Sequence, residues 1–172
     1  VAAHLGARIG RTLEAGDGLK LEEDSNLAAP ALILKVENRF SGGAVRMVTG
    51  PQTGHYDKAT FERFTKTTFR KSGQANRQAA MLEHDGKSFD AENALGVVSD
   101  VIVPGDIQMS GAGEPYVLMA ECQTVGGYPR IASVIPQDMP IVAQAAPETE
   151  LWFEVISLDE ADALHTSEMA LL

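Results

Sequence analysis

The sequence predicts a mainly β fold, an antiparallel β-barrel with two or three short helices. Short apolar runs that suit strands recur along the chain, and Gly or Pro turns separate them. Only two or three segments show the spacing or the caps of a helix. We expect a closed or nearly closed barrel, because closure removes the exposed edges that many short strands would otherwise leave.

Composition limits the function classes that are open to the chain. Its 172 residues, 44% of them apolar, suit one compact domain or one domain with an appended piece. The net charge of -10 argues against a nucleic-acid partner and disfavours an anionic membrane surface. No uncharged run is long enough to span a bilayer, and a single cysteine fits a reducing cytoplasm.

The first 25 residues are predicted to be separate from the barrel. Ala15 to Gly18 form a tight-turn sequence, and a short alternating strand follows at 19–21. Residues 22–31 are charged and then small, as in a linker. We therefore place a boundary near residue 25, with the barrel domain at 26–172.

The strand candidates show alternating or continuous apolar patterns. Val45 and Met47 alternate with polar positions in one of them, and Leu151, Phe153 and Val155 share one face of another. Two candidates, 116–121 and 130–135, are apolar almost throughout and are expected to be buried on both faces. In chain order the candidates are 32–36, 44–50, 68–72, 79–83, 106–110, 116–121, 130–135 and 150–157.

Three helices are predicted from caps and spacing. Residues 57–67 combine a capping Asp57 with Phe61 and Phe64 on one face. A short helix begins at 136–140, where Asp138 is the expected cap. Ser157 and Glu160 match a capping box, which predicts a last helix over 158–164 and a frayed tail at 165–172.

The stretch "ECQTVGGYPRI", residues 121–131, is the strongest candidate for a site. Gly126 and Gly127 permit close approach of another group, and Arg130 offers a planar fork of donors. Gln123 adds both a donor and an acceptor. From these residues alone a glycine hairpin with a solvated Arg130 is slightly favoured. Cys122 is interpreted as a small core residue, since nothing local would lower its pKa.

Two more polar clusters are interpreted, from their residues alone, as a solvated loop and a plain turn. The loop "KSGQANR" (71–77) contains Asn76 and Arg77, and Gln52 follows a strand end at Gly50-Pro51. The histidines are scattered without ligand spacing, so no metal site is predicted. No nucleotide-binding glycine motif is present.

Taken together, these separated segments resemble a known family. "GPQ", "S-x-Q-x-N-R", "PGDIQM" (104–109) and "QTVGGYPRI" (123–131) occur in its order over roughly residues 45–164. They resemble the C-terminal half of the allophanate hydrolase subunit 2 family, also known as KipA, the 5-oxoprolinase C subunit or the biotin-dependent carboxyltransferase domain. The resemblance implies a cyclophilin-like β-barrel. It also implies that residues 1–25 hold the closing strand of an N-terminal half.

The chain departs from the family pattern at several loop positions. "NRQAAML" replaces the usual Met-Gly and Arg-Leu pair, Val125 replaces a Thr, and "TGHY" follows "GPQ". The glycine turn and the "PGDIQM" strand are retained, so the resemblance supports the fold. It also implies that loop residues near Asn76 and Gln52 line the pocket, so these departures leave the substrate open.

The resemblance implies three alternative functions. In the first, the chain is a subunit of an ATP-dependent 5-oxoprolinase, inactive alone, with a KipI-like subunit 1 and a third subunit as candidate partners. In the second, it is a carboxyltransferase domain that acts on urea or a related amide, with biotin on a separate carrier. In the third, it is a non-enzymatic KipA-type module that sequesters a KipI-like kinase inhibitor.

The resemblance also assigns candidate residues for a small amide or lactam. No covalent cofactor is expected, and ATP would act through the complex. The implied catalytic residues are Gln123, Tyr128 and Arg130. The implied substrate-binding residues are Gln52, Asn76, Arg77, Gln108, Gly126 and Gly127.

Overall fold

The computed structural model describes residues 14–18, 41–89 and 98–169, with side chains described as far as residue 165. The chain divides into two compact units, residues 1–38 and 39–172. Within the first, the predicted turn is present: the N–H of Asp17 donates to the carbonyl of Glu14 at 3.1 Å. The strands predicted at 19–21 and 32–36, and the linker between them, lie outside the described residues.

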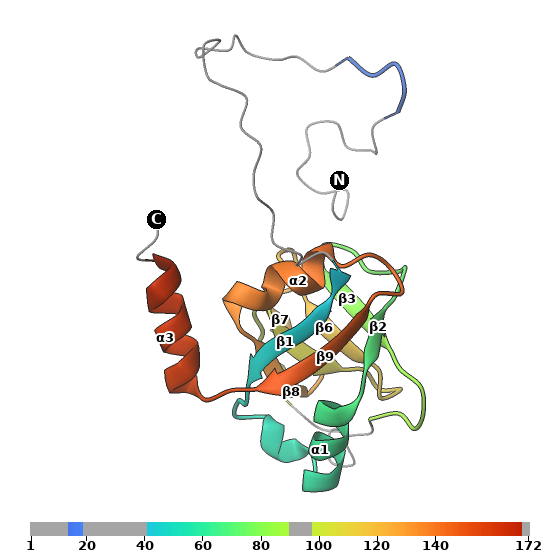
Figure 1. Cartoon of the computed structure of the whole chain (residues 1–172). Coiled ribbons are helices and arrows are strands. Elements are labelled where there is room, and N and C mark those ends of the chain that lie inside the picture. The colour runs from blue at the N-terminus through green and yellow to red at the C-terminus, as the bar shows by residue number, and fades with distance from the viewer. Residues whose placement is uncertain (1–13, 19–40, 90–97, 170–172) are drawn as a thin grey trace. The chain divides into compact units, whose positions relative to one another are not determined.

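Seven strands of the second unit close into a barrel, which confirms the predicted fold class (Figure 1). Their order around the barrel is β1, β8, β5, β6, β3, β2 and β9, and β9 returns to β1. Each corresponds to a strand candidate of the sequence. Their bounds are β1 (Gly43–Val48), β2 (Phe69–Lys71), β3 (Ala79–Glu83), β5 (Asp106–Met109), β6 (Pro115–Leu118), β8 (Arg130–Val134) and β9 (Glu150–Val155).

The pairing that closes the barrel is parallel, which is an exception to the predicted antiparallel arrangement. β1 and β9 run in the same direction, from Gly43 opposite Leu151 to Met47 opposite Val155. The other neighbours in the barrel are antiparallel. Seven is an odd number, so strand directions cannot alternate all the way round a closed ring. At least one neighbouring pair must be parallel, and here it is the first and last strands.

The barrel interior holds the core that the alternating patterns predicted. Val45, Met47 and Leu151 are fully buried and Phe153 is 2% exposed. Val155, predicted to share their face, is 45% exposed at the end of β9. The expectation that residues 116–121 and 130–135 are buried on both faces is wrong. Their strands β6 and β8 keep one face partly exposed, at Tyr116, Arg130 and Ser133.

Helix α1 (Lys58–Lys66) closes one end of the barrel (Figure 1). Asp57 caps it as predicted, since its Oδ1 accepts the N–H of Thr60 at 2.6 Å. Phe64 is fully buried, and its ring centroid lies 4.9 Å from that of Phe69 and 5.2 Å from that of Phe153. Burial of such a side chain contributes about 1.5–3 kcal/mol to folding.

Helix α2 (Met139–Gln144) crosses the opposite end of the barrel, after a 3-10 turn at Pro136–Asp138 (Figure 1). The short helix was predicted, but the capping role of Asp138 is wrong, because its side chain makes no cap hydrogen bond. Its buried carboxylate instead accepts three hydrogen bonds from Arg46 of β1, at 2.6 to 2.8 Å. This ion pair fixes the start of α2 against the barrel wall.

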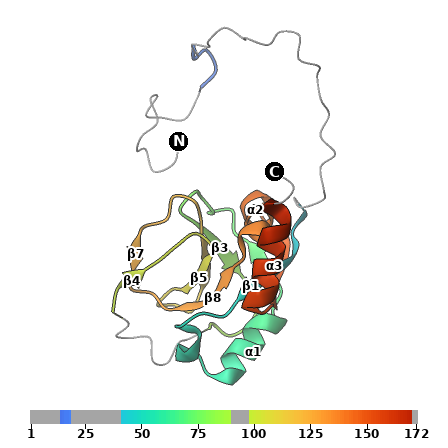
Figure 2. The ribbon, with the colours of Figure 1, turned by 90° about the vertical axis from the view of Figure 1, so that its left-hand side faces the viewer.

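Helix α3 (Leu158–Met169) stands beside the barrel (Figure 2). The capping box is confirmed: the N–H of Ser157 donates to Oε2 of Glu160 at 2.8 Å, and the N–H of Glu160 to Oγ of Ser157 at 3.2 Å. The helix is longer than predicted, so residues 165–169 are helical and no frayed tail begins at 165. None of the helices in the described ranges is long and apolar enough to cross a membrane.

A two-stranded sheet, which we call the arm, lies against the barrel on the side away from α3 (Figure 2). It pairs β4 (Asp100–Val101) with β7 (Val125–Gly126). The sequence did not predict these strands, because two residues are too few to show a period. The arm exposes apolar side chains, with Val101 63% and Val125 52% accessible.

Gly42→Ala tests the turn that leads into β1. Gly42 has a φ of +73°, and a Cβ there would lie 2.2 Å from the carbonyl oxygen of Glu150 on β9. We expect urea denaturation to show a lower free energy of unfolding, by about 1–3 kcal/mol from backbone strain alone. Gly111→Ala is the control, since a Cβ there meets nothing within 4 Å. Equal effects of the two substitutions would contradict this account.

Candidate functional site

A pocket of about 260 Å³ lies on the outer face of the barrel, and we call it the Tyr128 pocket. Strand alternation creates it, because Ile107, Val117 and Ala80 point into the core and leave their neighbours outside. Gln108 is directly opposite Tyr116 in the sheet, and Ala79 is opposite Leu118. The residues that line the pocket are Ala79, Gln108, Ser110, Tyr116, Leu118 and Tyr128.

Gly126 on the arm allows the arm to approach Gln108. A Cβ at Gly126 would lie 2.9 Å from Nε2 of Gln108 and 3.0 Å from Cδ1 of Ile102. Gln108 is 8% exposed, and its Nε2 donates to the carbonyl of Tyr128 in a long hydrogen bond of 3.4 Å. The glycine therefore has the close-approach role that the sequence suggested. Gly127 follows it in the loop that leads to β8.

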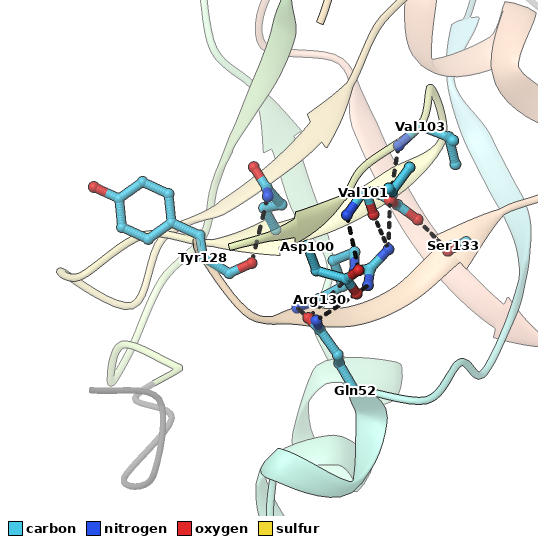
Figure 3. Close-up of polar contacts among 9 residues, drawn as sticks. Gln52, Asp100, Val101, Val103, Tyr128, Arg130 and Ser133 are labelled. Carbon is cyan, nitrogen blue, oxygen red and sulfur yellow. Dashed lines mark hydrogen bonds and ion pairs between the residues drawn. The ribbon is translucent and has the colours of Figure 1, made fainter. Parts of the chain in front are cut away.

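The two tyrosines of the pocket differ in exposure. Tyr128 is 56% exposed, and Figure 3 shows its ring turned away from Arg130. Tyr116 is partly buried, and burial, followed by the nearby Glu114 carboxylate, raises the pKa of its hydroxyl above the ordinary value. A hydrogen bond between the Tyr116 hydroxyl and Glu114 contributes to the same shift, so this hydroxyl is neutral and already has an acceptor beside it.

Arg130 does not face the Tyr128 pocket; its guanidinium binds the arm and the neighbouring loops (Figure 3). Nη1 donates to the carbonyl of Val101 at 2.8 Å, and Nη2 forms an ion pair with Asp100. The backbone N–H and Nε of Arg130 both donate to Oε1 of Gln52, at 3.0 and 3.2 Å. Gln52 also donates to Asp100 at 3.2 Å, so it completes this cluster.

The carboxylate of Asp106 is the buried centre of the same network. Asp106 is 2% exposed, and its Oδ2 accepts Nη1 of Arg130 at 3.2 Å and the N–H of Val103 at 3.0 Å. Its Oδ1 accepts the hydroxyl of Ser133 at 2.6 Å. Such a buried charge is stable only when it is paired and hydrogen-bonded. Asp106 thereby connects β5, β8 and the loop after β4.

The structure distributes the predicted site residues over separate places. Gln108, Tyr128 and Gly126 meet at the Tyr128 pocket, whereas Gln52 and Arg130 belong to the Asp106 network. Asn76 and Arg77 line another pocket, at the α2 end of the barrel. Gln123 is exposed just before β7 and lines neither pocket.

Sequence reasoning missed several residues that the fold brings to these places. Asp106 lies within the motif "PGDIQM" and was not selected, although an acidic residue beside a buried strand was the available signal. Tyr116 and Leu118 lie in an apolar run, in which the sequence did not show which side chains face outward. Their outward direction became evident only from the pairing of β6 with β3 and β5.

Cys122 is partly buried and lies outside the core cluster, so its interpretation as a core residue is wrong. Burial, followed by the charge of Asp106, raises the pKa of its thiol. Within the described ranges no three His, Cys, Asp or Glu side chains gather as metal ligands would.

Comparison with known proteins decides the family. The family model of the carboxyltransferase domain, subdomain A and B, matches residues 1–155. The chain belongs to this carboxyltransferase domain family. That confirms the resemblance drawn from "PGDIQM" and "QTVGGYPRI", because the family match and the motifs cover the same part of the chain.

Two curated relatives match nearly the whole chain. The C subunit of 5-oxoprolinase from Escherichia coli strain K12 is 32% identical over 157 residues, which is 91% of this chain and 49% of the relative. Its counterpart from Haemophilus influenzae, of the same name, is 28% identical over 162 residues, or 94% and 51% of the two chains. The chain therefore spans about half the length of the curated relatives it matches.

A solved structure supports the fold. The urea carboxylase of Kluyveromyces lactis superposes with a TM-score of 0.66 over 82% of this chain and 13% of that enzyme. The identity is 18%, so this likeness concerns the barrel architecture alone.

Asp106→Asn tests the buried network. Removal of the charge leaves Arg130, whose side chain is 17% exposed, without its buried partner. We expect the free energy of unfolding to fall by about 3 kcal/mol. Asp100→Asn removes the partner at the exposed end, where the carboxylate side chain is 53% accessible, and should cost less than about 1 kcal/mol. Urea denaturation of both variants measures the difference, and an equal cost would refute the central role of Asp106.

Alkylation of Cys122 tests its environment. Because its pKa is raised, less thiolate is present at any given pH than in free cysteine. We expect slower reaction with iodoacetamide in the folded protein at pH 8, and a rate profile whose midpoint lies above that of the urea-unfolded chain. A folded protein that reacts faster than the unfolded chain would contradict this assignment.

Proposed function

We propose that the chain acts as part of an ATP-dependent hydrolase complex that opens the lactam of 5-oxoproline to glutamate. The single observation that carries this proposal is the 32% identity to the C subunit of Escherichia coli 5-oxoprolinase over 91% of the chain. A KipI-like subunit 1 and a third subunit would be its partners. The assignment to this complex rests on those relatives, and we propose the Tyr128 pocket as its site.

The Tyr128 pocket offers what recognition of an amide or lactam needs. Gln108 carries both a donor and an acceptor, so it can pair with the N–H and the carbonyl of a cyclic amide. The neutral hydroxyl of Tyr116 would donate to an oxygen on which charge develops in exchange for its hydrogen bond to Glu114. Tyr128 would cover the ligand with its exposed ring. In the reaction the lactam C–N bond breaks and one water supplies the oxygen gained by the carbonyl carbon and the proton gained by the nitrogen. Hydrolysis of ATP to ADP and phosphate would drive this step.

In this proposal Arg130 acts as a positioning residue. Its bonds to Val101, Asp100 and Asp106 hold the arm, and the arm brings Gly126 beside Gln108. Gln52 supports Arg130 from the turn before α1. The catalytic role that the resemblance assigns to Gln123 stays a prediction, and Gln123 is exposed just before the arm.

Transfer of a carboxyl group from biotin on a separate carrier to urea or a related amide is the second candidate. Membership of the carboxyltransferase domain family favours it. The same pocket would then bind the ureido group. A third candidate, a non-enzymatic module that binds a KipI-like inhibitor, is favoured by the exposed valines of the arm, Val101 and Val125.

The deciding experiment reconstitutes the full-length protein with its partner subunits. Hydrolase function predicts glutamate release from 5-oxoproline that depends on ATP. Carboxyltransferase function predicts instead that carboxybiotin is consumed when urea is added. If neither reaction occurs while the KipI-like partner binds, the non-enzymatic function is supported and the proposed hydrolase is refuted.

Tyr128→Ala tests the location of the site in the same assay. We expect a fall in kcat/KM of about tenfold or more, because the aromatic contact with the ligand is lost. Trp152→Ala is the matched control, since Trp152 is an exposed aromatic residue on β9, which is not adjacent to β3, β5 or β6. If the two variants were equally active, the substrate would not bind in the Tyr128 pocket.

A further inference from the structure

A second pocket, of about 310 Å³, lies at the α2 end of the barrel, and we call it the Lys71 pocket. It is separate from the Tyr128 pocket because successive residues of β3 point to opposite faces. Ala80 lines the Lys71 pocket, whereas Ala79 lines the outer one. Its principal walls are Lys71, Ala75, Asn76, Arg77, Ala80 and Met119. Ala80 and Met119 belong to the barrel core, so the pocket reaches the interior face of the sheet.

Lys71 places its amino group at the inner end of this pocket, where burial lowers the pKa of the ammonium. The residue is 7% exposed, and its Nζ donates to the carbonyls of Ala143 at 2.8 Å and Ala145 at 2.9 Å. These carbonyls belong to the end of α2, where unpaired acceptors accumulate. An ammonium has three donors, and two are used here. No carboxylate of the described residues lies within ion-pair distance of Nζ, although buried charges are usually paired.

The rim of the pocket adds further donors. Arg77 is exposed, and its Nε donates to Glu121 at 2.9 Å, which holds the guanidinium beside the opening. Oδ1 of Asn76 accepts the N–H groups of Gln78 and Ala79, at 2.8 and 3.2 Å. The amide oxygen of Asn76 is thereby occupied within its own loop, and its NH₂ group is the remaining polar end. The side-chain groups of Asn76 and Arg77 that are available to a ligand are therefore hydrogen-bond donors.

Between these donors the wall is made of small apolar groups. The methyl groups of Ala75 and Ala80 and the thioether of Met119 line it. A dianion such as phosphate would leave oxygens against this apolar wall without donors, which is costly. A molecule with one carboxylate and a short aliphatic body satisfies both the cation and the wall.

We propose that the Lys71 pocket is a binding site for a short-chain aliphatic carboxylate. The carboxylate oxygens would accept the third donor of Lys71 and a donor of Arg77, and the aliphatic body would contact Ala75, Ala80 and Met119. Arg77 is paired with Glu121, so the ammonium of Lys71 is the cation of this pocket that has no carboxylate partner among the described residues and can attract a small anion. The proposal does not rest on hydrolase or carboxyltransferase function, since none of the lining residues belongs to the Tyr128 pocket.

The test titrates the whole chain, labelled with ¹³C at Ala and Met methyl groups, with butyrate and with butyramide. The two probes have nearly the same shape and differ in charge. We expect butyrate to shift the methyl signals of Ala75, Ala80 and Met119 in a saturable way. Butyramide should bind about tenfold more weakly or worse, because the charge-assisted hydrogen bonds are lost. Equal binding of the two probes, or no shift of these methyl groups, would overturn the proposal.

Substitutions test whether butyrate binding depends on the charge of Lys71. Lys71→Met keeps an unbranched apolar stem and should weaken butyrate binding about tenfold or more. Arg70→Gln is the matched control, because Arg70 is the adjacent residue of β2, carries the same charge and pairs with Asp85 outside this pocket. If Lys71→Met fails to fold, Arg77→Gln replaces it, with the same expected direction. Butyrate affinity unchanged in Lys71→Met, or unchanged in Arg77→Gln when that variant is used, would refute the site.

Discussion

The parallel contact between β1 and β9 is the constraint on which the rest of the barrel depends. β9 is the last strand in sequence and lies between β1 and β2, so the core is closed only when the C-terminal part of the chain is in place. Phe153 on β9 then meets Phe64 of α1, and Leu151 is enclosed. Both pockets lie on walls whose positions this closure fixes.

A second constraint, the buried charge of Asp106, determines the outer site. An isolated carboxylate in this environment would be unstable, and three donors from Arg130, Ser133 and Val103 compensate for its burial. The same bonds hold the arm, whose own two-residue strands are too short to be stable alone. The hydrogen bonds of Asp106 and Arg130 therefore stabilise this side of the barrel and also hold the arm beside the Tyr128 pocket.

The two pockets use the two faces of one sheet for different chemistry. The outer face presents an amide and two phenol rings, which suit the amide or lactam group of a ligand. The inner face presents a buried ammonium with small apolar neighbours, which suits an anion. Alternation along β3, and from the end of β6 to the next residue, separates them, since Ala79 and Leu118 face outward while Ala80 and Met119 face inward.

The sequence by itself determined the barrel strands in the described part of the chain, the Asp57 cap and the Ser157–Glu160 capping box, because these depend on local periodicity and on side chains three residues apart. It also located Gly126 and Gln108. Only the tertiary structure decided the parallel closure, the pairing of Asp138 with Arg46 and the use of Arg130 by Asp100 and Asp106. The partners in each case are far apart in sequence, and local patterns carry no information on which distant charge a side chain will meet.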